Sequence, residues 1–104
     1  FSMVEFNAIK AWKRHKDMTL NLIVPVGEIK FVLYDNTHNQ NTQFNEFTLS
    51  RENYCRLTVP PMVWVGFKGL SEAGSMLLNI ANLEHNPLEV DRKNIDEIIF
   101  NWDN

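Results

Sequence analysis

The sequence predicts an all-β chain with a jelly-roll-like arrangement of antiparallel strands. Short apolar stretches recur at intervals of roughly ten residues with turn-forming residues between them, which is the pattern of β-sandwiches and barrels. Residues 28–35 alternate strictly, with Ile29, Phe31 and Leu33 on one face. No long stretch has the 3.6-residue period of an amphipathic helix, so an α/β fold is not expected.

The predicted strands follow one another along the whole chain. They cover residues 1–6, 9–12, 18–26, 28–35, 44–49, 54–59, 63–67 and 76–81. We expect 18–26 and 28–35 to form a hairpin around Gly27, because Pro25-Val26-Gly27 is a turn signal. The tail, residues 94–102, combines helical spacing of its apolar residues with β-forming Ile98-Ile99-Phe100, so its structure is left open.

Pro60 and Pro61 form a corner between two apolar strands. Proline fixes φ and lacks a backbone donor, so the pair ends the strand before it and sets the direction of the next. At such a corner a sheet can fold back on itself. We therefore expect this segment to organise the fold.

Composition bounds the function classes. The 104 residues suit one domain, 1–104, with an ordinary globular content of 44% hydrophobic and 22% charged residues. A net charge of −3 favours neither nucleic acid nor an anionic membrane as a partner, and no apolar run is long enough to span a bilayer. The single cysteine, Cys55, excludes an internal disulfide framework and suits the cytoplasm.

The strongest local signal is a basic strand. Five of the seven residues from Lys10 to Lys16 are basic or titratable, and alternation places Lys13 and His15 on the same face. Such a cluster is either a solvated strand end or the wall of a pocket for an anionic ligand. The pattern alone leaves both readings open.

Three segments carry a resemblance to a known family. They are 21–32 (Asn-Leu-Ile-Val-Pro-Val-Gly-Glu-Ile-Lys-Phe-Val), 47–53 (Phe-Thr-Leu-Ser-Arg-Glu-Asn) and 57–67 (Leu-Thr-Val-Pro-Pro-Met-Val-Trp-Val-Gly-Phe). Over residues 9–102 the chain resembles the dTDP-4-dehydrorhamnose 3,5-epimerase family of cupins. The resemblance implies a cupin-type jelly roll, a homodimer, and one or two strands preceding Phe1.

The resemblance also implies a function. Family members epimerise, and related cupins keto-isomerise, a nucleotide-linked keto-deoxy-sugar during synthesis of surface-polysaccharide precursors, without a cofactor. By position, Lys10 replaces the arginine that meets the diphosphate, and Lys13 replaces the histidine base. Asn82 and Leu83 fall where an orienting aspartate and an acidic tyrosine lie, and Val65 replaces a second histidine. The alternative is therefore a non-catalytic sugar-nucleotide-binding or structural cupin.

The candidate catalytic residues are Lys13, His15 and Tyr34. A lysine serves as a base only when burial or nearby cations lower its pKa. A histidine can act near neutral pH, although a structural role for His15 is equally open. Tyr34 is either an acid or a sheet-surface residue.

The candidate ligand-binding residues are Lys10, Arg14, Arg56, Trp64 and His85. Trp64 either stacks on the ligand or packs into core or interface. His85 either closes the pocket mouth or caps a turn. When the chain is matched to metal-binding cupins, His15 is the only one of the four metal ligands that is retained. No metal is therefore expected.

Overall fold

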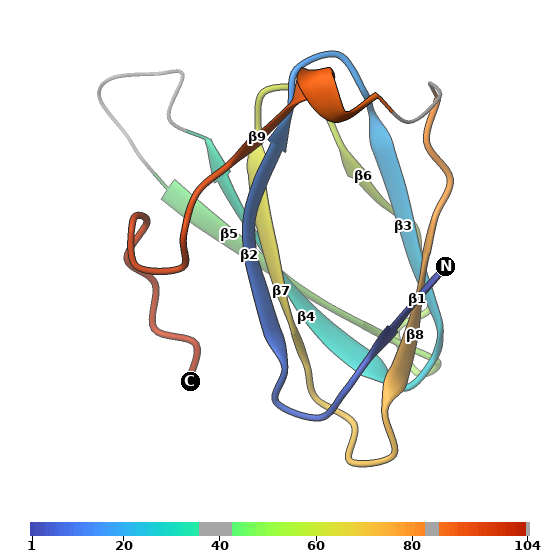
Figure 1. Cartoon of the computed structure of the whole chain (residues 1–104). Helices are drawn as coiled ribbons and strands as arrows, with labels where there is room; N and C mark the ends of the chain where they lie inside the picture. The colour runs from blue at the N-terminus through green and yellow to red at the C-terminus, as the bar shows by residue number, and fades with distance from the viewer. Residues whose placement is uncertain (36–42, 83–85, 104) are drawn as a thin grey trace.

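Two antiparallel sheets face each other and form the body of the molecule (Figure 1). The computed structural model describes residues 1–35, 43–82 and 86–103. One sheet has the strand order β1-β8-β3-β6, from Ser2–Val4, Ser75–Asn79, Leu20–Val26 and Leu57–Val59. The other has the order β5-β4-β7-β2-β9, from Gln43–Ser50, Glu28–Asp35, Trp64–Gly69, Ile9–His15 and Val90–Arg92. The predicted all-β jelly-roll class is confirmed.

The main core lies between the two sheets, where alternate residues of both point inward. In β4 the predicted alternation is confirmed, because Ile29, Phe31 and Leu33 join this core. Val32, from the same strand, packs on the opposite side. The buried members of the main core are Val4, Met18, Leu20, Leu22, Val24, Ile29, Phe31, Leu33, Leu49, Leu57, Val59, Val65 and Leu77.

The predicted hairpin around Gly27 is wrong. Strands β3 and β4 lie in different sheets, so the turn between them is a corner that crosses the core rather than a hairpin. Gly27 has φ +85, and a Cβ there would lie 2.7 Å from the carbonyl oxygen of Gly74. Only glycine combines this backbone conformation with so close an approach. The hairpin partner of β4 is β5, which pairs with it over its full length.

The Pro60-Pro61 corner also crosses from one sheet to the other. It follows β6 in the four-stranded sheet, and the chain re-emerges as β7 in the five-stranded sheet. Proline cannot extend the strand before it, which agrees with the expected end of β6 at Val59. The crossing brings Val65 into the main core and Trp64 to the other face of the same sheet.

The C-terminal tail, residues 93–103, is neither helix nor strand beyond short turns, and it covers the outer face of the five-stranded sheet (Figure 1). There it forms the tryptophan cluster with β2, β4 and β7. Its buried members are Trp12, Val32, Trp64, Ile98 and Trp102, and Ile9, Ala11, Tyr34, Phe44 and Phe100 pack against them. A second, smaller core therefore occupies the face that alternation alone would leave to solvent.

Two short elements near the end of the chain were not predicted from the sequence. A 3₁₀ helix, η1, spans Pro87–Glu89 and leads directly into β9, which pairs with β2. The Asn86 side chain accepts a hydrogen bond from the Leu88 amide and caps η1. Nowhere in the described ranges is there a helix of the length and apolarity needed to cross a membrane.

Candidate functional site

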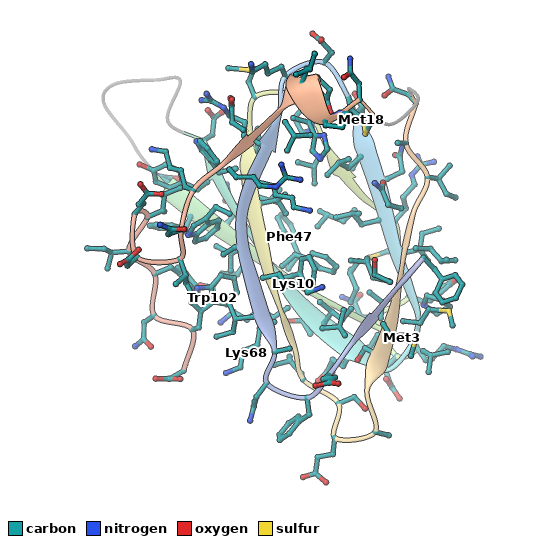
Figure 2. The ribbon with its side chains drawn as sticks, in the orientation of Figure 1. Met3, Lys10, Met18, Phe47, Lys68 and Trp102 are labelled. Atoms are coloured by element: carbon teal, nitrogen blue, oxygen red, sulfur yellow. The ribbon has the colours of Figure 1, made fainter. Side chains whose placement is uncertain are left out.

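The inner face of β2 carries the basic residues into the space between the sheets. Lys10 pairs in register with Phe67 and Lys13 with Val65, and both partners pack with the main core. The register shifts between Lys10 and Lys13, so two residues at an odd spacing share one face. Figure 2 shows Lys10 between the two sheets.

Two cavities meet at this face. The larger, of about 1070 Å³, runs from β1 past β2 to the start of the tail, and the smaller, of about 240 Å³, lies toward the η1 end. Both are lined by Lys13, His15, Asn79 and Arg92. Leu20, Leu22, Phe67 and Leu77 give the larger cavity an apolar wall. Convergent polar groups on an apolar background are typical of small-molecule sites.

Positive charge is concentrated in the cavity. Partial burial of Lys13, followed by the nearby Arg92 and Lys10, lowers the pKa of its ammonium group from the ordinary value. Within residues 1–35, 43–82 and 86–103, no ion pair joins Lys10, Lys13 or Arg92 to a carboxylate. Asp96 and Glu97 line the tail end of the larger cavity. The three cations are thus available to an anionic ligand.

His15 is paired with Glu89 of η1. Its Nδ1 lies 2.5 Å from Glu89 Oε1. The other carboxylate oxygen accepts hydrogen bonds from the backbone amides of Lys16, Asp17 and Met18. The His15 contact, helped by the amides, outweighs burial and lowers the pKa of Glu89 to about 2. The turn between β2 and β3 is therefore built around this carboxylate.

This pKa sets an acid limit on stability. A carboxyl group whose native pKa lies below its ordinary value of 4.5 stabilises the folded chain above about pH 4.5 and loses that effect as the pH falls toward 2. We expect Glu89→Gln to lower the free energy of unfolding at pH 6 and the difference from the wild type to shrink toward pH 2. Urea unfolding at several pH values measures this. Glu52→Gln, at an exposed side chain, is the control, and a pH-independent difference at Glu89 would contradict the expectation.

Several predicted site residues lie elsewhere. Arg14 points to the outer face, where its guanidinium pairs with Asp91 at 2.8 Å and lies 4.8 Å from the ring centroid of Trp64. Trp64 itself is buried in the tryptophan cluster. Tyr34 belongs to the same outer face, with its ring centroid 5.0 Å from that of Phe44. The structure therefore does not bring these three together with Lys13 and His15.

The remaining predicted residues do not join the cavities either. Arg56 is exposed just before β6 and lines neither cavity. His85 lies outside the described residues. Asn82, which falls where the resemblance implies an orienting aspartate, accepts a hydrogen bond from the Thr19 amide. No cluster of three or more histidine, cysteine or acidic side chains suited to a metal occurs among the described residues.

Three residues of the site were missed from the sequence: Glu89, Arg92 and Asn79. Glu89 lies in η1 and contacts His15, and Arg92 lies in β9, which pairs with β2. Both contacts span more than seventy positions of sequence. No local pattern reports so long a contact. The only local signal was Asn86-Pro87, which is typical of a capped helical turn.

Comparison with known proteins decides the family. A structure of a dTDP sugar isomerase from Desulfovibrio desulfuricans superposes with a TM-score of 0.90 and 37% identity, covering 97% of this chain and 68% of that one. The chain belongs to the family of this dTDP-sugar isomerase. The family resemblance found in the sequence is thus confirmed, although no protein-family model matches the chain.

Two further proteins are more distantly similar to the chain. The probable low-salt glycan biosynthesis epimerase Agl13 of Haloferax volcanii is 28% identical over 82 residues, which are 76% of this chain and 53% of that protein. The chain thus spans about half the length of this curated relative. A dTDP-4-dehydrorhamnose 3,5-epimerase from Sulfolobus tokodaii has the same fold, with a TM-score of 0.79, 19% identity, and coverage of 95% and 58%.

Proposed function

We propose that the protein is an isomerase or epimerase of a nucleotide-linked keto-deoxy-sugar used to make polysaccharide precursors. The observation that carries this proposal is the convergence of His15, Lys13 and Arg92 on one cavity, with His15 paired to a carboxylate. Membership of the dTDP-sugar isomerase family supports the substrate class. No cofactor is needed for the step described next.

His15 and Lys13 have complementary roles in the proposed reaction. His15 removes a proton from a carbon next to the sugar's ketone, and the electron pair of the broken C–H bond forms an enolate. The Lys13 ammonium stabilises the enolate oxygen, and its lowered pKa favours proton donation. Protonation of the opposite face of the same carbon by solvent water, with release of the first proton from His15 to solvent, epimerises that carbon. Return of the proton to the former carbonyl carbon, after proton transfer between the two oxygens, moves the ketone.

The cations account for the nucleotide part of the substrate. Lys10 and Arg92 are proposed to bind the diphosphate, because both line the larger cavity and neither pairs with a carboxylate within the described residues. Arginine suits bidentate contact with phosphate, whereas lysine acts as a point charge. Tyr34 and Trp64, on the outer face, have no part in this proposal.

A homodimer and a cytoplasmic location belong to the same proposal. The outer face of the four-stranded sheet carries an apolar stripe, because Met3 pairs with Met76 and Ile23 with Leu78 on the side away from the core. Figure 2 shows Met3 on this side. A partly exposed apolar sheet face is suited to a second copy of the chain. The unpaired, exposed Cys55 is consistent with a reducing compartment.

The alternative, a sugar-nucleotide-binding protein without catalysis, is favoured by one observation. Val65 lines the cavity beside Lys13 where the resemblance implies a second histidine. A binding-only protein would be stabilised by a nucleotide sugar, since a ligand bound only to the folded state raises the melting temperature, but would show no turnover.

Incubation with a dTDP-4-keto-6-deoxyhexose in D₂O tests the proposal. We expect deuterium to enter the sugar next to the ketone, detected by NMR and mass spectrometry, together with a new epimer or keto isomer. Chromatography of the products separates these two reactions. Thermal stabilisation without deuterium or a new product would instead establish the binding-only alternative. Absence of stabilisation, exchange and product would reject both.

A further inference from the structure

A hydrogen-bonded turn holds Glu89 beside His15. The Asn86 side chain caps η1, and the Glu89 amide donates to the Asn86 carbonyl at 3.1 Å. The Glu89 carbonyl in turn accepts from the Lys16 amide at 2.8 Å. Backbone contacts at both ends thus fix the position from which the Glu89 side chain reaches β2. The side chain is almost fully buried.

The two oxygens of this carboxylate have different partners. Oε2 accepts from the amides of Lys16 at 3.1 Å, Asp17 at 3.1 Å and Met18 at 3.3 Å. Oε1 is left for Nδ1 of His15. Three amide donors converging on one oxygen define the orientation of the whole group, because only an acceptor can satisfy them.

The charge state of Glu89 decides which imidazole nitrogen bears the proton. A carboxylate with a pKa of about 2 is ionised at neutral pH and can only accept. His15 Nδ1 must therefore be the donor, and in the neutral ring Nε2 carries the lone pair. The ring lines both cavities. Among the described residues, the only hydrogen-bond partner of the ring is Glu89.

We infer that Glu89 is a positioning residue that fixes the tautomer of His15, so that Nε2 is the proton acceptor of the cavity. This inference rests on the proposed function in one respect, namely that His15 is the base. Glu89 does not touch the substrate, and it acts through the imidazole. The Glu89 carboxylate of η1 thereby orients the His15 ring. Asn82 does not orient it, because its side chain accepts from the Thr19 amide.

Glu89→Gln is the decisive substitution, because the amide has nearly the same shape. The three backbone amides select the glutamine oxygen, so its NH₂ group turns toward His15 and donates to Nδ1. The neutral ring is then driven to the opposite tautomer, with the proton on Nε2. ¹⁵N NMR of the imidazole nitrogens, with His15 assigned through His15→Gln, distinguishes these tautomers directly in both the wild type and the variant.

The wild type is expected to show the Nδ1-protonated tautomer and Glu89→Gln the Nε2-protonated one. With an active substrate, kcat of the variant should fall by about 10²- to 10⁴-fold, as for other misplaced general bases. Its Kd for dTDP, measured by calorimetry, should change by less than about 3-fold, because only a step of the reaction is affected. Asp91→Asn, which alters the neighbouring outward carboxylate, is the matched control and should keep the His15 tautomer.

Two results would overturn the inference. One is an Nε2-protonated His15 in the wild type. This measurement does not require that any variant folds. The other is a Glu89→Gln protein that keeps either the wild-type tautomer or the wild-type kcat. If the wild type turns over no keto-sugar, the proposed function fails, and the tautomer measurement still decides whether Glu89 orients His15.

Discussion

Lys13→Gln is expected to lower kcat by about 10²- to 10⁴-fold, the usual cost of losing a group that stabilises or protonates a developing charge. Lys13 lies on the cavity face of β2, opposite Val65. Steady-state kinetics with a dTDP-keto-sugar measure the change. Because kcat reports on the reaction and Kd for dTDP on nucleotide binding, a fall in kcat with little change in Kd would place Lys13 at the sugar.

The same substitution should not destabilise the fold. A lysine whose native pKa is lowered disfavours the folded state while it is protonated, and this cost is relieved only as the pH rises toward the ordinary value of 10.5. At neutral pH the neutral glutamine removes the cost. Lys16→Gln is the matched control, since Lys16 is half-exposed and pairs with Asp91. Equal activity losses in Lys13→Gln and Lys16→Gln would contradict a specific role for Lys13.

Trp12→Ala is expected to lower the free energy of unfolding by about 3–5 kcal/mol, the range for deleting a large buried aromatic side chain. Trp12 is 1% exposed, its ring centroid lies 5.5 Å from that of Trp102, and its Nε1 donates to the Ile98 carbonyl at 3.2 Å. The substitution therefore opens a cavity and releases the tail from the sheet. Urea unfolding followed by circular dichroism measures the change.

Two controls separate the contributions at Trp12. Trp12→Phe keeps a ring and loses the Nε1 hydrogen bond, so it should cost clearly less than the alanine variant. Ile99→Ala alters a tail residue that is 86% exposed, and its effect should stay within about 0.5 kcal/mol. A cost for Trp12→Ala as small as that of Ile99→Ala would mean that the tail does not pack on the outer face.

Local patterns were sufficient for the strands and for part of the site. Alternation assigned both faces of β4, and it placed Lys13 and His15 together on β2. It does not place Lys10 with Lys13, because three positions separate them. The register shift between Lys10 and Lys13 brings them to one face. The basic cluster and the family resemblance both pointed to Lys10 beforehand, but neither gave its orientation.

Long-range pairing explains what the sequence left undetermined. A glycine turn such as Gly27 suits a hairpin and a crossing between sheets equally well, and the choice depends on which partner strands complete each sheet. Strand β4 finds its neighbours in β5 and β7, so β3 is left to pair with β6 and β8. Glu89 and Arg92 depend in the same way on the return of the chain to β2.

Strands β2 and β7 and the tail bring every tryptophan of the chain into one place. The three tryptophans of the sequence, Trp12, Trp64 and Trp102, all belong to the tryptophan cluster on the outer face. Intrinsic fluorescence of this protein is therefore a local signal. Tryptophan emission reports whether residues 93–103 are docked on the sheet, whereas events confined to the β1-β8-β3-β6 sheet leave this emission unchanged. Following emission and circular dichroism together would distinguish release of the tail from unfolding of the two sheets.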